Sequence, residues 1–274
     1  MSALFSSIGR ILLVGAGNMG GAMVRGWIEG GVSTADIHVV DPTPGEALRG
    51  LIADGALSQS GTVPDGKFDV VVLAVKPQAM DAALPPLKSA MAQETLVLSI
   101  AAGKTLGFLE ARLGALPIVR AMPNTPALIA RGITGAFANA AVTTDLRAKA
   151  DALLSASGPV LWLDSEGDID AVTAVSGSGP AYVFLLAEAM ASAGEAAGLS
   201  PDLAMILARH TVAGAGELMI RSDDAPAQLR RNVTSPNGTT QAALDVLMAA
   251  DGLPPLMTRA VLAARDRARA LSEE

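Results

Sequence analysis

The strongest constraint on the fold is a series of apolar runs, each about as long as a β-strand, that recur through the first 163 residues. They read RILLVG, DIHVVD, FDVVVLAV, ETLVLSIA, LPIVRAM, ITGAFAN and GPVLWL, at residues 10–15, 36–41, 68–75, 94–101, 116–122, 133–139 and 158–163. Segments of helical period separate them, and strands that alternate with helices favour a parallel, doubly wound sheet with helices on both faces. We therefore expect an α/β, Rossmann-type dinucleotide-binding domain over residues 1–163.

Beyond residue 163 the strand-like runs disappear, and alanine-rich segments of helical period replace them. Pro180 and Pro201 stand where proline is favoured, in the first turn of a helix, and Ser200 is a suitable N-cap for the second. Helices are expected at residues 180–197, 201–220 and 225–231, and after Gly238 and Leu253. We therefore expect an all-α domain over residues 164–274.

These helical segments carry small and apolar residues on more than one face, as LLAEAMASAGEAAG and MILARHTVAGAGELM show. Small residues let helices approach closely, and an apolar surface wider than one stripe indicates burial against a second subunit. We expect this domain to form an intimate homodimer. A self-contained helical bundle is the alternative.

Composition excludes several classes of function. The 274 residues include no cysteine and only two histidines, so disulfides, thiolate nucleophiles and a histidine-rich metal site are excluded, and no bound metal is expected. His38 alternates with apolar neighbours as a strand residue does, and His210 lies within a helical segment. A net charge of −7 and an aromatic content of 3% argue against nucleic-acid binding.

Half of the residues are apolar, which raises the question of a membrane. The longest uncharged apolar stretch, residues 171–187, is interrupted by SGSGP, and we expect it to fall short of a bilayer-spanning helix. The sequence MSALFSSIGR lacks the basic start and long apolar run of a secretory signal. We expect a soluble, cytoplasmic protein without a membrane partner.

The sequence GAGNMG follows the first apolar run and begins a helical segment. It fits the pattern G-x-G-x-x-G, in which glycine permits a tight turn and lets the backbone approach a pyrophosphate at a helix N-terminus. The strand-turn-helix context is typical of a dinucleotide site. The expected cofactor-binding residues here are Gly15, Ala16, Gly17, Asn18, Met19 and Gly20.

Asp41 ends the second apolar run, at about the spacing from the glycines at which an acidic residue binds the ribose 2′-hydroxyl of NADH. Its carboxylate would repel the 2′-phosphate of NADPH, no Arg or Lys follows within the loop, and Pro42 has no backbone N–H. The expected cofactor is NADPH or NADH, with NADH slightly favoured. If Asp41 only caps the next turn, Thr43 and the backbone would still admit the phosphate.

Two further loops follow predicted strands at the carboxyl edge of the sheet, where such loops lie over the cofactor crevice. In AVKPQ, the residues expected to contact the nicotinamide ribose or the phosphates are Ala74, Val75, Lys76 and Pro77. A solvated loop lysine is the alternative. Asn124 lies between two prolines in AMPNTP and is expected to line the nicotinamide site.

Two polar segments of the helical half are too orderly for linkers: AVSGSGPAYVF, which contains Ser178, and NVTSPNGTTQAAL at residues 232–244. Each puts Gly, Ser or Thr just ahead of a helix, which is an N-cap signature and also a way to build an anion site from backbone N–H groups. Capping explains each segment taken singly. Two of them in one half of a nucleotide-binding protein favour a substrate site.

With these residues in view, the chain resembles the pyrroline-5-carboxylate reductase family nearly from end to end. The blocks that carry the likeness, in the family's order, are GAGNMG, AVKPQ, SIAAG, AMPNTPA, DAVTAVSGSGPAY and QLRRNVTSPNGTTQAAL. The resemblance implies the last step of proline biosynthesis, in which the cyclic imine 1-pyrroline-5-carboxylate is reduced to L-proline by hydride from NADPH or NADH. It also implies a dimer of interleaved helical domains, often assembled into a decamer, with substrate between one subunit's cofactor and helices of the pair.

The resemblance places the substrate carboxylate on the loop at residues 235–240. Thr240 matches the threonine whose hydroxyl lies near the ring nitrogen, and it is the expected catalytic residue. The expected substrate-binding residues are Ser178, Ser235, Gly238, Thr239 and Thr240. Many members carry Asn, Ser or Arg where this chain has Asp41 and Pro42, so the family's usual preference for NADPH does not carry over.

Three other functions share parts of this pattern. A β-hydroxyacid or 6-phosphogluconate-type dehydrogenase has the same two halves, but it needs a buried lysine base in the second, and residues 164–274 contain no lysine. A nucleotide-sensing protein without turnover would not need the two polar segments. A Rossmann methyltransferase would not need the helical half.

Overall fold

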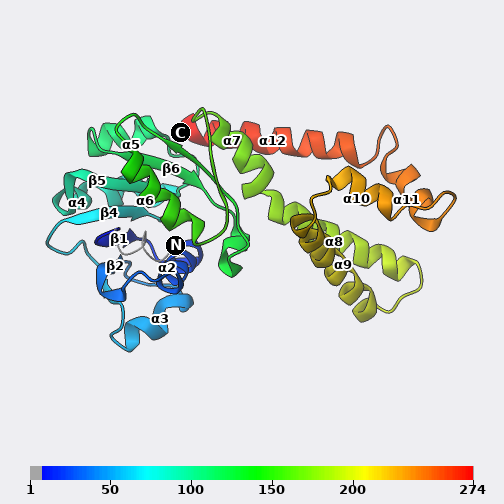
Figure 1. Ribbon diagram of the computed structural model, residues 1–274, viewed down its shortest axis with the longest axis horizontal. Coiled ribbons are helices and arrows are strands. Elements are labelled where there is room, and N and C mark those ends of the chain that lie inside the picture. The colour runs from blue at the N-terminus through cyan, green and yellow to red at the C-terminus, as the bar shows by residue number, and fades with distance from the viewer. Residues whose placement is uncertain (1–7, 274) are drawn as a thin grey trace. The chain divides into compact units, whose positions relative to one another are not determined.

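The chain folds into two compact units in the computed structural model, which describes residues 8–273 (Figure 1). The first unit contains the residues up to Gly177 together with those from Ala264 onward, and the second is Ser178–Ala263. The last strand ends at Trp162, next to the expected end of the first domain at residue 163. The first unit extends further along the chain because the next helix and the last turns of the C-terminal helix belong to it.

An eight-stranded sheet forms the centre of the first unit, in the order β3-β2-β1-β4-β5-β6-β7-β8. The first six strands along the chain are parallel, and their order is that of a Rossmann fold, as expected. The strands are β1 (Ile11–Val14), β2 (Ile37–Val40), β3 (Ser58–Ser60), β4 (Phe68–Leu73), β5 (Met91–Ser99), β6 (Ile118–Met122), β7 (Thr134–Ala138) and β8 (Val160–Trp162).

Two features of the sheet differ from the expectation. β7 runs antiparallel to β6, so the sheet is mixed. The segment between them holds only the short 3-10 helix Thr125–Ile129 and no crossover helix, which a parallel connection needs. β3 was not predicted, because its sequence SQS has no apolar residue. This strand lies at the edge of the sheet and pairs only with β2.

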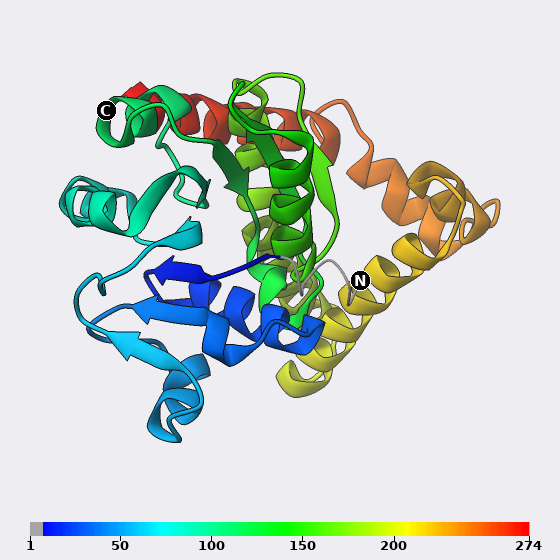
Figure 2. The same cartoon turned by 60° about the vertical axis from the view of Figure 1, so that its left-hand side comes forward.

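Side chains of alternate strand residues fill two hydrophobic cores, one on each face of the sheet. Leu13, Val72 and Leu98 pack on the core formed with α2, α3 and α6, whereas Val14 and Leu73 pack on the core formed with α4 and α5. The helices of this unit lie on both sides of the sheet (Figure 1, Figure 2). This alternation follows from the two-residue period of a strand. The helices are α2 (Asn18–Gly30), α3 (Glu46–Ala53), α4 (Met80–Leu87), α5 (Leu106–Leu113) and α6 (Thr144–Ser155).

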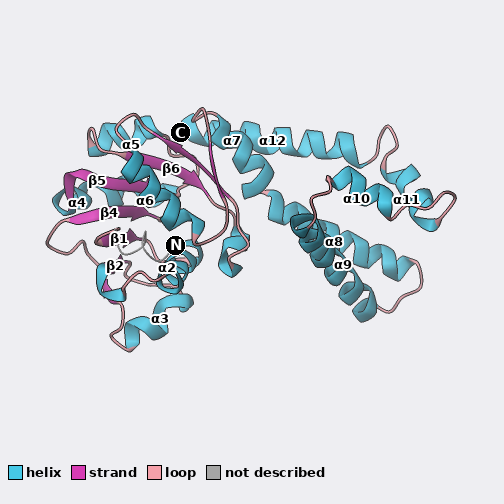
Figure 3. Ribbon diagram, viewed as in Figure 1, coloured by secondary structure: helices cyan, strands magenta, loops and turns pink. Residues whose placement is uncertain are grey.

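The rest of the described chain is helical and contains no strand beyond β8 (Figure 3). Its helices begin and end close to where the sequence predicts them, except for α7, which was not predicted. They are α7 (Asp168–Val172), α8 (Gly179–Ala196), α9 (Pro201–Arg221), α10 (Pro226–Asn232), α11 (Thr239–Leu247) and α12 (Leu253–Glu273).

Helix α8 begins just after Ser178, as the segment SGSGP predicts, but the Ser178 side chain makes no capping hydrogen bond, because the helical run already starts at Asp168. A π-helical turn, Thr173–Gly177, joins α7 to α8, and Ser178 itself has helical dihedrals of φ −83° and ψ −23°. Residues Asp168–Ala196 are therefore one continuous helix. A π-helical turn is a wider turn, and here it lies just ahead of Pro180, whose ring would crowd the preceding turn of a regular α-helix.

By length and composition, two helices, Asp168–Ala196 and Pro201–Arg221, could cross a membrane, so the expectation that SGSGP interrupts such a span was wrong. Only 11% of each apolar window is buried within a single chain. Many large apolar side chains of α8 and α9 are consequently exposed there, including Phe184, Leu185, Leu203, Ile206, Leu207 and Leu218. An exposed apolar surface of this kind indicates a contact with another molecule.

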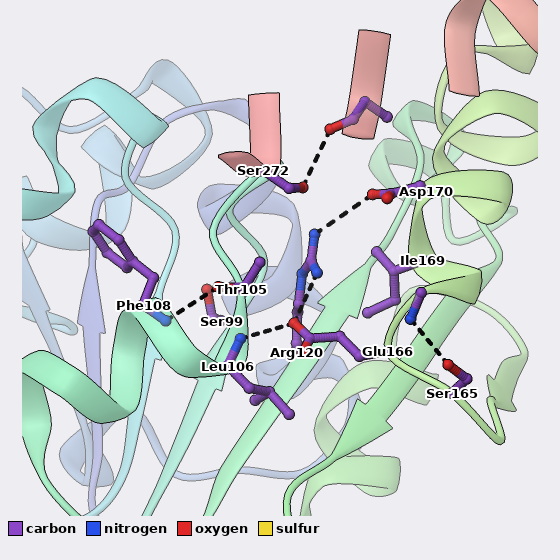
Figure 4. A network of polar contacts seen from close by, with 12 residues as sticks. Ser99, Thr105, Leu106, Phe108, Arg120, Ser165, Glu166, Ile169, Asp170 and Ser272 are labelled. Atoms are coloured by element: carbon purple, nitrogen blue, oxygen red, sulfur yellow. Dashed lines mark hydrogen bonds and ion pairs between the residues drawn. The ribbon is translucent and has the colours of Figure 1, made fainter. Parts of the chain in front are cut away.

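A buried arginine ties α7 to the sheet within the first unit (Figure 4). The Arg120 side chain, on β6, is 4% exposed, and its Nη1 lies 2.8 Å from Glu166 Oε1, with Nη2 4.0 Å from Asp170 Oδ1. Glu166 Oε1 also accepts a hydrogen bond of 2.8 Å from Leu106 N, in the first turn of α5. One carboxylate therefore joins β6, α5 and the start of α7.

Replacing Arg120 with Met should destabilise the protein, because Glu166 and Asp170 would lose their cation while the side-chain length is kept. Breaking a buried pair costs about 3–5 kcal/mol, and the partial exposure of Glu166 lowers our expectation to about 2 kcal/mol. The free energy of unfolding, measured in urea at fixed protein concentration, checks this value. Arg112→Met is the control, because the exposed Arg112–Asp81 pair should contribute less than about 1 kcal/mol. Equal losses in both variants would contradict the expectation.

Candidate functional site

The glycine-rich turn joins β1 to α2 at the carboxyl edge of the sheet. Gly15 has a φ of 92°, and a Cβ there would lie 2.8 Å from the Ala74 backbone. A Cβ at Gly20 would collide with the carbonyl oxygen of Gly15. A Cβ at Gly17, in contrast, would meet nothing within 4 Å. The first and third glycines therefore serve the packing of the turn, while the second leaves an open face of the kind that a pyrophosphate needs.

α2 begins directly behind this open face. Gly17 is its N-cap, and no side chain caps the helix. The first N–H groups and the positive end of the helix dipole are thus free to bind an anion. Of the remaining residues predicted here, Ala16 is buried, Asn18 is exposed and Met19 is half-buried.

Asp41 lies beside the turn, held by two backbone N–H groups. Its Oδ2 accepts a hydrogen bond of 2.7 Å from Ala16 N, and its Oδ1 accepts one of 2.8 Å from Thr43 N. Asp41 thus does cap the next turn, which was the alternative to a cofactor role. A carboxylate has about four lone-pair sites, so each oxygen can still accept a ribose hydroxyl.

Two residues that hold Asp41 and the neighbouring Ala16 in place were not identified from the sequence. Gln59, on the unpredicted strand β3, donates from Nε2 to the carbonyl oxygen of Asp41 (2.6 Å). Gly45 donates its N–H to the carbonyl oxygen of Ala16 (2.7 Å), and a Cβ at Gly45 would lie 2.9 Å from that oxygen. The one available signal for Gly45 was its place in DPTPG, which is typical of a turn.

The loop after β4 lies next to the glycine turn, since Ala74 N donates to the Val14 carbonyl oxygen (2.8 Å). Lys76 is exposed and precedes a short 3-10 helix that starts at Pro77. Asn124 follows β6 and uses its Oδ1 to accept a 3.0 Å hydrogen bond from Ile133 N. Asn124 therefore shapes its own loop, and its contact with a nicotinamide stays a prediction.

The second unit contains the uncapped N-terminus of α11. Asn237 adopts left-handed φ of 57°, Gly238 N donates to Ser235 O (3.0 Å), and Gly238 is the N-cap with no side-chain cap. The hydroxyl groups of Ser235, Thr239 and Thr240 make no hydrogen bond to any described residue. The segment is a helix start, as predicted, but its side chains leave the helix end open.

The three further candidate residues are Ser178, His38 and His210. Ser178 lies inside the continuous helix, and its hydroxyl also has no partner among the described residues. His38, on β2, contacts Ser60 Oγ at 2.8 Å, and burial together with nearby Arg10 lowers its pKa. His210 is exposed on α9. Within residues 8–273 no cluster of His, Asp and Glu could hold a metal ion.

Comparison with known proteins covers both units. Residues 166–271 match the family described as pyrroline-5-carboxylate reductase dimerisation, and residues 10–103 match that of the coenzyme F420-dependent NADP oxidoreductases. The chain is 48% identical to a pyrroline-5-carboxylate reductase of Pseudomonas aeruginosa, over 97% of each chain.

Two solved structures are similar over almost their whole length. A pyrroline-5-carboxylate reductase from Coxiella burnetii has a TM-score of 0.88 at 37% identity, covering 97% of this chain and 99% of that one. The pyrroline carboxylate reductase of Plasmodium falciparum, with NADP bound, has a TM-score of 0.80 at 28% identity, covering 96% and 98%. The likeness therefore includes the glycine turn, the sheet and the helical unit together, and this chain belongs to the pyrroline-5-carboxylate reductase family.

Proposed function

We propose that this protein reduces 1-pyrroline-5-carboxylate to L-proline with hydride from NADH or NADPH. The observation that carries the proposal is the 48% identity to the Pseudomonas aeruginosa reductase, which extends over both units. The absence of lysine from residues 164–274 argues against the β-hydroxyacid dehydrogenases, whose chemistry needs a lysine base there.

The first unit fits a dinucleotide. The open face at Gly17 and the uncapped start of α2 would hold the pyrophosphate, and Asp41 would hold the adenosine ribose. We assign further contacts to the predicted residues of the same edge, which are Gly15, Ala16, Asn18, Met19, Gly20, Ala74, Val75, Lys76, Pro77 and Asn124. When bound, the nicotinamide supplies a hydride from its C4.

The start of α11 fits a small carboxylate. Thr239 and Thr240 offer backbone N–H groups without a competing side-chain cap, at the positive end of the helix dipole, whereas Gly238 N already donates to Ser235 O. We propose that the N–H groups of Thr239 and Thr240 bind the substrate carboxylate there, beside Gly238, which has no side chain to obstruct it. The hydroxyl of Ser235 lies in the same loop, and Ser178 contributes a further contact. The loop needs no charged side chain, because backbone N–H groups and the helix dipole already favour the negative charge of the substrate carboxylate.

The reaction requires few catalytic groups from the protein. The carbon of the C=N bond accepts the hydride, the nitrogen takes the electron pair of the π bond, and a proton from solvent completes the secondary amine unless the imine is already protonated. We assign to the Thr240 hydroxyl the hydrogen bond that orients this nitrogen. Positioning accounts for most of the rate under this proposal.

A direct assay tests the function. Purified protein is mixed with 1-pyrroline-5-carboxylate and either NADH or NADPH, and cofactor oxidation is followed by absorbance, with L-proline measured as the product. Turnover with at least one cofactor is expected. Absence of turnover with both, in protein shown to be folded, would refute the proposal.

We also propose the form in which the enzyme acts, a cytoplasmic homodimer that assembles further into a decamer. The exposed apolar residues of α8 and α9, among them Phe184, Leu185 and Ile206, lie within the region that matches the dimerisation family. Light scattering coupled to gel filtration should give two or ten times the chain mass of 27.7 kDa. A monomer at micromolar concentration would refute this assembly.

Thr240→Ala should lower kcat by about 10-fold or more, because it removes the hydrogen bond to the ring nitrogen, the atom whose charge changes during hydride transfer. Thr240→Ser keeps a hydroxyl and should retain most of the activity. Steady-state kinetics with saturating cofactor measure both variants. Unchanged kcat in Thr240→Ala would remove the hydroxyl from the mechanism.

Gly238→Ala should raise KM for the substrate by about 10-fold or more, because small displacements of a binding group are costly to catalysis. A Cβ at this position would lie 2.7 Å from Ser235 Oγ and 3.1 Å from Ser235 O, so the loop must move. KM for the cofactor should not change. Gly50→Ala, where a Cβ meets nothing within 4 Å, is the matched control. An unaltered substrate KM in Gly238→Ala would move the carboxylate site elsewhere.

A further inference from the structure

We propose that the turn at residues 41–45 makes this enzyme select NADH over NADPH. The inference rests on the proposed function and deepens it, since it names the form of cofactor that the site accepts. It depends on the hydrogen-bond inventory of the turn, which the sequence alone does not reveal.

No backbone N–H group of residues 41–45 is free to donate a hydrogen bond to a ligand. Pro42 and Pro44 have no N–H group. Thr43 N donates to Asp41 Oδ1 (2.8 Å). The two ends of the turn are used as well, because Asp41 N donates to Ser60 O (3.1 Å) and Gly45 N donates to Ala16 O (2.7 Å). A 2′-phosphate needs several donors for its oxygens, and this backbone offers none.

The charge at the turn also opposes a phosphate. Asp41 is the carboxylate that faces the glycine turn, and the hydrogen bonds from Ala16 N and Thr43 N fix both of its oxygens in place. A 2′-phosphate carries a charge of about −1.5 to −2 at neutral pH and would be repelled. A ribose hydroxyl, in contrast, donates a hydrogen bond to this acceptor.

No cation compensates nearby along the chain. Residues 26–48 contain no Lys or Arg, and Arg49, the first one after the turn, is exposed on α3. The bonds that hold Asp41 also prevent the carboxylate from turning away without leaving Ala16 N or Thr43 N unpaired. Charge, donor inventory and rigidity therefore act in the same direction.

The test compares kcat/KM for NADH and for NADPH in the wild type and in Asp41→Ser. We expect the wild type to favour NADH by about 10-fold or more, equivalent to about 1.4 kcal/mol. Asp41→Ser should lower that ratio by a similar factor, mainly through a gain in the use of NADPH. Asp54→Ser removes one negative charge from an exposed residue at the end of α3 and should leave the ratio unchanged.

A binding measurement separates this inference from the proposed reaction. Calorimetric titration of the wild type with 5′-AMP and with adenosine 2′,5′-bisphosphate needs no turnover. 5′-AMP should bind more tightly, and Asp41→Ser should reduce the difference. A wild type that prefers NADPH or the bisphosphate, or a ratio unaltered in Asp41→Ser, would overturn the inference. Absence of turnover with either cofactor, together with tighter 5′-AMP binding, would refute the reaction but support the selection.

Discussion

The parallel pairing of β1 with β2 on one side and β4 on the other determines where the nucleotide-binding groups of the first unit lie. The ladders continue one residue past the strands, as Gly15 N donates to Val40 O and Ala74 N to Val14 O. Three loops therefore leave the sheet at the same edge, and the strand order reverses between them. Gly15 can have no side chain because the Ala74 backbone lies against it. Gly17, two residues further on, lies in open space at the same edge of the sheet.

Much of the sheet could be predicted from the sequence because both of its faces are covered. A strand covered on both faces must be apolar at successive positions, and β1, β4 and β5 are. β3 has no such signature, because it adds only three polar residues at an edge. The direction of β7 is set by the length and content of the connection from β6, and the apolar run ITGAFAN does not encode it.

Some residues of the candidate site could likewise be predicted from the sequence, and others could not. Residues whose proposed roles depend on their own identity could be named from the sequence, Gly17 and Asp41 from a motif and Thr240 from the family resemblance. Gln59 and Gly45 act through their position beside Asp41 and Ala16, and only the folded chain brings them there. Ser178 precedes α8 as predicted but makes no capping bond, because a π-helical turn joins α7 to α8, and the sequence rule for helix starts does not anticipate such a turn. The site roles themselves stay predictions.

The polar loop ahead of α11 has a consequence for how the enzyme should respond to acidity. Between Arg231 and Asp245 the chain has no side chain that ionises near neutral pH, so this loop brings no titration of its own to the reaction. The main-chain dipoles that replace charged groups have the same strength at every pH at which the fold persists. The carboxylate binding that we propose for this loop would therefore not change with proton concentration, and the pH dependence of the rate would reflect the acid-base behaviour of the imine nitrogen.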